Sequence, residues 1–197
     1  MIISDIRTHL LSVPYIDPPQ VGFIPLRNID LLVVEVETRS GIIGTGHLHP
    51  LAGGMRTLEM CVQEMLKPLL IGQDGREVEA LWHKMWEATF IQGRMGITVM
   101  AMSALDVALW DALGRSENMP LWELWGGQPE PLPVYGSGCY RGLGHDGMIE
   151  KAERFVGQGF KAIKMQVAHL FSHDEDVANV RDMRVALGDK IEIMVDV

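Results

Sequence analysis

A lysine and a carboxylate stand near the ends of two apolar segments that each predict a buried strand. In residues 159–167 the side chains of Lys164 and Gln166 share one face, because side chains alternate along a strand. In residues 191–197 the same alternation sets Asp196 opposite a row of Ile and Val residues. An ammonium group is costly to bury unless it is paired or used. The pattern predicts a polar centre at the ends of two parallel strands.

From residue 131 onward the sequence alternates between strand-like and helix-like segments, which are residues 132–139, 145–158, 161–167, 173–187 and 191–197. Single apolar strands joined by helices are βαβ units, and such units form a parallel sheet. An eightfold barrel of this kind takes about 250 residues, so the segment supplies only about three of its strands. Because the chain stops at Val197 inside a strand pattern, we expect it to be the N-terminal portion of a longer protein.

The preceding part of the chain predicts an α+β module. Strands over residues 2–13, 30–38 and 42–49 predict an antiparallel meander. Helical periodicity follows over residues 55–70, 76–90, 97–113 and 121–125. Residues 97–113 are apolar nearly all round, so this helix should be central, and its Asp106 and Asp111 are expected in surface or interface ion pairs.

Composition and charge exclude several classes of function. The 197 residues include 17 Lys and Arg against 26 Asp and Glu, a net charge of −9, and no basic cluster is present. We therefore expect no nucleic-acid partner. The apolar runs are too short or too interrupted to cross a membrane, and the N-terminus lacks a signal-peptide pattern. Cys61 and Cys139 are far apart and are interpreted as free thiols of a reducing compartment, which favours a cytoplasmic protein.

Two further places could contact a substrate. The Pro-rich segment 14–28 carries many apolar groups, including Phe23, and either folds onto its own domain or forms a lid over a substrate. His47 and His49 share a strand face. They can be metal ligands, the edge of a pocket, or ordinary surface or core histidines, and no third ligand is evident nearby.

Four motifs resemble those of a known family. Ala104–Gly114 (ALDVALWDALG) and Pro120–Gly127 (PLWELWGG) are similar to the helical signature of the mandelate racemase and muconate lactonizing branch of the enolase superfamily. Residues 159–166 resemble the Lys-x-Lys strand of that branch, and residues 193–196 resemble the strand that carries its first metal-ligating acid. The resemblance covers nearly the whole chain in the same order.

The resemblance implies an α+β capping domain, residues 1–127, followed by the start of a modified (β/α) TIM-type barrel, residues 128–197. It implies an Mg²⁺ site at the barrel mouth, with Asp196 as one ligand and the others beyond Val197. The shared chemistry is removal of the proton α to a carboxylate, and Lys164 would neutralise the charge that develops. On the first barrel strand, Ser137 and Cys139 are expected to share one face. They match positions that either contact substrate or pack the strand end. Relatives of this kind commonly form homo-oligomers.

Gln166 departs from the family pattern, which has a catalytic lysine at this position. An amide can form hydrogen bonds but cannot take up and release a proton near neutral pH. Racemisation needs a base on each face of the substrate, so Gln166 favours dehydration of an acid sugar. A racemase or cycloisomerase, and a relative that binds a carboxylate without turnover, stay open. A nucleotide-binding domain is weak, because no Gly-x-Gly-x-x-Gly motif follows a strand.

Overall fold

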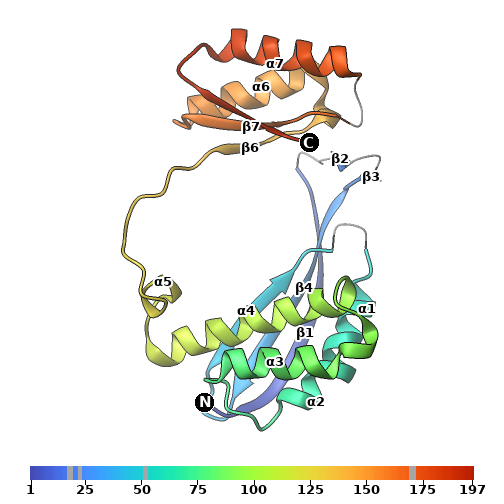
Figure 1. The fold of residues 1–197 in the computed structure, drawn as a ribbon, viewed down its shortest axis with the longest axis vertical. Helices are drawn as coiled ribbons and strands as arrows, with labels where there is room; N and C mark the ends of the chain where they lie inside the picture. The colour runs from blue at the N-terminus through green and yellow to red at the C-terminus, as the bar shows by residue number, and fades with distance from the viewer. Residues whose placement is uncertain (17–19, 22–23, 51–52, 169–171) are drawn as a thin grey trace. The chain divides into compact units, whose positions relative to one another are not determined.

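A computed structural model describes residues 1–16, 20–21, 24–50, 53–168 and 172–197. The chain divides into two compact units (Figure 1). Unit 1 comprises residues 1–13 and 29–129, and unit 2 comprises residues 14–28 and 130–197. The division therefore falls two residues beyond residue 127, and the segment 14–28 clusters with unit 2.

The sheet of unit 1 is the predicted one. It contains β1 (Ile3–Pro14), β4 (Asn28–Thr38) and β5 (Ile43–Leu48) in the order β1-β4-β5, and β4 and β5 are antiparallel. On β4 the buried residues are Leu32, Val34, Val36 and Thr38, every second position. In the sequence between β1 and β4, the short strands β2 (Gln20–Val21) and β3 (Ile24–Pro25) form a separate antiparallel pair. The predicted lid residue Phe23 lies outside the described residues.

The helices of unit 1 lie where the periodicity predicts them. They are α1 (Met55–Met60), η1 (Cys61–Leu66), α2 (Lys67–Leu70), α3 (Val78–Ala88), η2 (Phe90–Gln92), α4 (Ile97–Glu117) and α5 (Leu121–Leu124). One difference is that residues 55–70 do not form a uniform α-helix, because η1 is a π-helical segment. Cys61, Val62 and Leu66 of this segment are buried in the main core.

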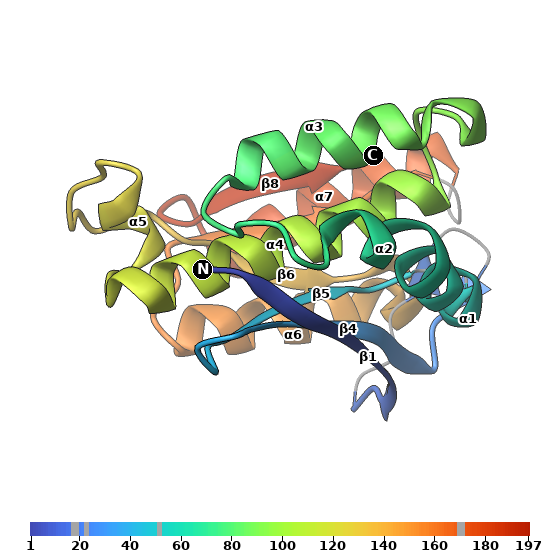
Figure 2. The same cartoon turned by 90° about the horizontal axis from the view of Figure 1, so that it is seen from below.

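Helix α4 packs against the sheet at unusually short range. Gly44 and Gly46 of β5 face it, and the layered arrangement of α3, α4 and the sheet is visible in Figure 2. A Cβ atom on Gly46 would lie 2.0 Å from the backbone oxygen of Ala104, and one on Gly44 would lie 2.1 Å from that of Ala108. Only glycine allows this approach, and it explains why one face of β5 carries no side chains at these positions.

Helix α4 also differs from the expectation about membranes. Its 21 residues have a mean hydropathy of 1.4 over the most apolar window, which is enough to cross a bilayer by length and composition alone. The core helix of a globular domain has the same properties. Ala101, Leu105 and Leu109 of α4 are completely buried in the unit 1 core, so we interpret α4 as a core helix.

The part of unit 2 after residue 130 consists of parallel strands covered on one side by helices (Figure 1). Its elements after residue 130 are β6 (Gly136–Cys139), η3 (Arg141–Leu143), α6 (Gly144–Gly157), β7 (Ala162–Gln166), α7 (His173–Leu187) and β8 (Glu192–Asp196). The strands pair parallel in the order β6-β7-β8. The apolar residues between sheet and helices include Met148, Ile163, Met165 and Met183. The predicted βαβ rhythm is confirmed.

Strand β6 is shorter than predicted. It begins at Gly136 rather than Leu132, and Leu132 and Val134 are 81% and 68% exposed. Gly136 lies against α6, where a Cβ atom would come within 2.4 Å of the Phe155 ring. Close packing on α6 is seen at Gly136, whereas Leu132 and Val134 line a cavity with Phe160.

We predict that Gly46→Ala destabilises unit 1 by about 1–3 kcal/mol or more, because the methyl group overlaps backbone atoms of α4 that cannot move aside. Urea unfolding followed by circular dichroism measures the change. Thr45→Val, on the exposed face of the same strand, is the matched control and should change the free energy of unfolding by less than about 0.5 kcal/mol. Equal effects of both variants would contradict the packing described.

Candidate active site

The register of β7 and β8 brings the two charged residues of the predicted centre together. Lys164 pairs with Met194, and Gln166 pairs with Asp196. The Nζ atom of Lys164 lies 3.2 Å from Oδ2 of Asp196, and the two side chains are 29% and 49% exposed. An ion pair this accessible adds little to stability. What it shows is that both groups lie on one sheet face, at the carboxyl ends of parallel strands, where α/β folds bind ligands.

Gln166 lies at the same edge of the sheet. Its Oε1 accepts a hydrogen bond from the backbone N–H of Arg141, 3.4 Å away, at the end of β6. The amide therefore connects the ends of β6 and β7. Its NH₂ group forms no hydrogen bond with the described residues, so it can donate to a ligand.

Ser137 and Cys139 do not share a face, contrary to the prediction. Ser137 pairs with Lys164 and is exposed, whereas Cys139 pairs with Met165 and is 1% exposed. The register shifts between these two residues, an irregularity that reverses the alternation. Cys139 consequently joins the apolar cluster beneath the helices. Burial raises the pKa of its thiol to about 11, and the charge on Lys151 opposes this only in part.

Side chains of α7 and its N-cap hydrogen-bond to backbone N–H groups between β7 and the first turn of α7. Ala168 has φ 66°, a left-handed conformation that is costly for a residue with a Cβ atom. Its N–H donates to Oδ2 of Asp176, 2.7 Å away, in the first turn of α7. Ser172 and Glu175 form a capping box at the start of this helix. These contacts fix the backbone of Ala168, just after β7, and the first turn of α7.

The remaining predicted contacts come from unit 1 or lie outside the described residues. His47 is exposed on β5 and forms no hydrogen bond or ion pair with the described residues. His49 is partly buried, and its Nδ1 lies 2.7 Å from the backbone oxygen of Asp30. The roles proposed for His47 and Ser137 therefore stay predictions, as does that of Phe23.

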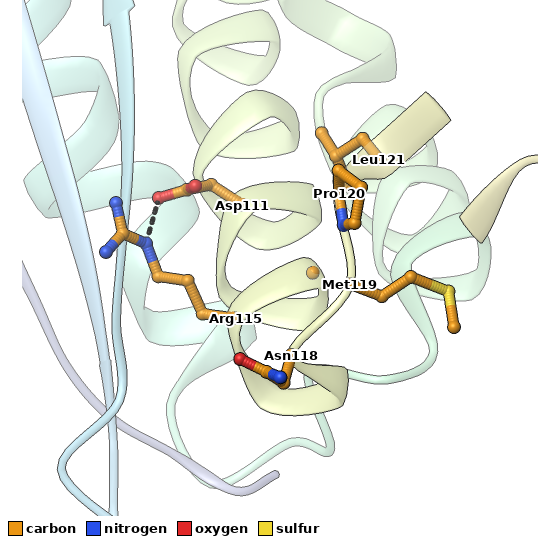
Figure 3. Close-up of a pocket in the computed structure, with 7 residues that line it drawn as sticks. Asp111, Arg115, Asn118, Met119, Pro120 and Leu121 are labelled. Carbon is orange, nitrogen blue, oxygen red and sulfur yellow. Dashed lines mark hydrogen bonds and ion pairs between the residues drawn. The ribbon is translucent and has the colours of Figure 1, made fainter. Parts of the chain in front are cut away.

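Two cavities in unit 1 contain none of the predicted site residues. The first, about 340 Å³, lies at the C-terminal end of α4 (Figure 3). There Asp111 pairs with Arg115 at 2.8 Å and also accepts the N–H of Thr45, so its charge joins helix and sheet. The second cavity lies beside Asp106, which forms no ion pair with the described residues. Burial raises the pKa of the Asp106 carboxyl.

The described residues do not by themselves form a metal site. They contain no group of three or more His, Cys, Asp or Glu side chains that could hold an ion. Asp196 is the carboxylate at the strand ends, and its oxygen atoms are the hard donors that Mg²⁺ prefers. It therefore fits the role of one Mg²⁺ ligand.

Comparison with known proteins agrees with this geometry. The family model described as "Mandelate racemase / muconate lactonizing enzyme, N-terminal domain" matches residues 5–126, and the model "Enolase C-terminal domain-like" matches residues 147–197. The chain belongs to the mandelate racemase/muconate lactonizing enzyme family. Its fold is accordingly an α+β capping module followed by the start of a β/α barrel.

Individual relatives are enzymes. The chain is 35% identical to a 3,6-anhydro-alpha-L-galactonate cycloisomerase of Streptomyces coelicolor over 99% of its length, and 31% identical to an arabinonate dehydratase of Saccharolobus solfataricus over 99%. The crystal structure of a racemase from Streptomyces coelicolor A3(2) with bound magnesium superimposes with a TM-score of 0.93 at 33% identity, over 99% of this chain and 55% of that one. The chain spans 54% and 53% of the two curated relatives.

Arg141 lies beside the candidate site and was not singled out from the sequence. It is the first residue of η3, two residues after β6, is 6% exposed, and its backbone N–H contacts Gln166. The only signal in the sequence is an arginine two residues after a strand, between glycine-rich segments. This signal is too common to single out a residue.

We predict that Cys139 reacts very slowly with thiol reagents in the native protein. A buried thiol with a pKa of about 11 is ionised in about one molecule in a thousand at pH 8. Alkylation followed by peptide mass spectrometry measures this, and denaturation should release the reactivity. The control is Ser137→Cys, whose thiol on the exposed face should react quickly. Rapid labelling of Cys139 in the native protein would contradict its burial and indicate that its thiol is accessible beside the candidate site.

Proposed function

We propose that this protein is a Mg²⁺-dependent enzyme that removes the proton α to a carboxylate, and that it is an acid-sugar dehydratase. The observation that carries the proposal is the approach of Lys164 Nζ to Asp196 Oδ2, 3.2 Å, at the ends of parallel strands. The comparisons support the proposal, because the chain belongs to a family that includes dehydratases and cycloisomerases. Here unit 1 is the capping domain.

Asp196 would hold the ion through its carboxylate oxygen atoms. When bound, Mg²⁺ stabilises the negative charge that develops on a substrate carboxylate during proton removal. The described residues supply this one ligand, and in this proposal the others come from residues outside the chain described here.

Lys164 would bind and orient the reacting carboxylate. Its ammonium group already lies beside Asp196, so a carboxylate bound there meets positive charge at short range. Such a group is worth most where negative charge grows during the reaction. Partial burial of the Lys164 side chain, 29% exposed, limits screening by water.

Gln166 would position the substrate by donating hydrogen bonds through its NH₂ group, since its Oε1 is engaged by the backbone of Arg141. It cannot act as a base. One face of the substrate therefore has no proton acceptor at this position, which favours dehydration over racemisation. In dehydration a single acid–base group on the other face can remove the proton and then protonate the departing hydroxyl.

Cycloisomerisation is the second candidate, favoured by the 35% identical relative that carries that name. Dehydration of an acid sugar releases water and leaves a ketone after tautomerisation, whereas cycloisomerisation opens or closes a ring without loss of water. The full protein is incubated with acid sugars and their lactones, and carbonyl reagents detect turnover. Mass spectrometry then separates the two reactions, because only dehydration lowers the mass by one water. A relative that binds carboxylates without turnover would give neither product.

The setting of the enzyme is part of the proposal. Both cysteines are free and buried, and relatives are metabolic enzymes acting on small acids. We propose a cytoplasmic homo-oligomer that acts on a small-molecule carboxylate, with neither nucleic-acid nor membrane partners. Light scattering on the purified protein measures the oligomeric state.

We predict that Asp196→Asn lowers kcat/KM on the order of 100-fold and weakens Mg²⁺ binding, because an amide is a poorer ligand for a hard cation than a carboxylate. Steady-state kinetics with Mg²⁺ titration, and EDTA treatment of the unmodified protein, measure both effects. Asp189→Asn, in the exposed turn before β8, is the matched control. If Asp196→Asn binds Mg²⁺ as tightly as the unmodified protein, the assigned ligand is wrong.

We predict that Gln166→Ala lowers kcat/KM about tenfold, because hydrogen bonds to the substrate are lost. Gln166→Glu keeps the shape but removes the NH₂ donors and adds a negative charge, so it should lower activity further. Kinetics on an acid sugar that is turned over measure both variants. Unchanged turnover in Gln166→Ala would remove this residue from the site.

A further inference from the structure

Arg141 carries a charge that the described structure leaves without a partner. The residue is 6% exposed, and within the described chain its Nε and Nη1 atoms are buried and have no acceptor. A buried guanidinium group with unmade hydrogen bonds costs free energy, and an anionic ligand would remove that cost. The orphaned donors therefore point to a ligand.

The neighbouring charges do not supply the missing acceptor. Lys164 and Asp196 pair with each other. Gln166 is neutral, and its oxygen contacts the backbone of Arg141 rather than the guanidinium. Asp176 uses Oδ2 for Ala168, and its Oδ1 is itself buried without a partner. No ion pair joins Asp176 to Arg141 among the described residues.

The position of Arg141 just after strand β6 suggests which part of a substrate it would meet. Strand β7 lies between β6 and β8 (Figure 1). Lys164 and Asp196 define a centre on β7 and β8, whereas Arg141 follows β6, two strand spacings or about 10 Å from β8. A six-carbon acid is long enough to span from the Lys164 centre to Arg141 if its opposite end lies along the sheet toward β6, and this orientation is part of the proposal below.

The chemistry of that opposite end follows from the guanidinium. Its paired N–H groups match the two oxygen atoms of a carboxylate. A sugar hydroxyl could accept a hydrogen bond but would leave the buried charge uncompensated. A second carboxylate satisfies both requirements.

We propose that Arg141 binds the far carboxylate of a dicarboxylic acid sugar, and that dicarboxylates are therefore preferred to monocarboxylates. The proposal rests on the proposed function for the position of the reacting end. Arg141 acts here as a residue that determines substrate specificity.

Galactarate and galactonate test the proposal, because they differ only in a carboxylate or a hydroxymethyl group at the far end. Calorimetric titration of each acid into the full protein, with Mg²⁺ present, should give a lower dissociation constant for galactarate than for galactonate. In Arg141→Met the ratio of the two dissociation constants should fall about 10- to 100-fold, the loss expected for charge-assisted hydrogen bonds. Arg181→Met, the same change at an exposed position of α7, should leave the ratio unchanged.

Thermal unfolding without ligand provides a second measurement. Removing an uncompensated buried charge should leave the melting temperature of Arg141→Met unchanged or raised. The structural alternative is a pairing of Arg141 with Asp176. It predicts lower melting temperatures for Arg141→Met and Asp176→Asn, with no change in the ratio of dissociation constants, and that result would overturn the proposal.

The outcome is separable from that of the proposed function. Binding of galactarate that depends on Arg141, without turnover, would support the inference and count against the dehydratase. Turnover with equal preference for the two acids in both proteins would support the enzyme and overturn the inference.

Discussion

The parallel, in-register pairing of β7 with β8 is the constraint on which the candidate site depends. It sets Gln166 beside Asp196 and brings Lys164 within an ion-pair distance of the same carboxylate. A slip of one residue would turn one of these side chains toward the apolar layer under the helices, because alternate residues face opposite sides. Parallel pairing requires a crossover, and the capping box at Ser172 marks where the crossover helix α7 begins.

Residue alternation and periodicity were sufficient to predict much of this arrangement. Ile163 and Met165 are buried beneath the helices while Lys164 and Gln166 lie on the other face, as a period of two requires. The alternation of strands and helices after residue 130 and the long apolar helix α4 were likewise predicted, because each follows from a repeating pattern of apolar residues. The family motifs added what no pattern could give, namely the resemblance of these strands to those of the mandelate racemase and muconate lactonizing enzymes.

Other features depend on contacts that one segment does not encode. Cys139 was assigned to the wrong face, because an irregularity in the pairing of β6 with β7 reverses the alternation. Gly138 lies at the shift with φ 152°, but a glycine in a strand does not by itself show that the pairing changes there. The π-helical segment over Cys61–Leu66 was invisible, since its residues keep a helix-like apolar spacing. Arg141 could not be singled out, because its lack of a partner is a property of its surroundings after folding.

The seam between β5 and α4 has a consequence for how this protein can diverge. The atoms that would meet a side chain on Gly46 belong to the main chain of α4, so no exchange of residues in the helix can make room for one. A second mutation in α4 therefore cannot compensate for a side chain at Gly46. Libraries that seek new activities should vary the loops instead. The capping module can thus vary at its edges while its central helix and strand stay locked in one spacing.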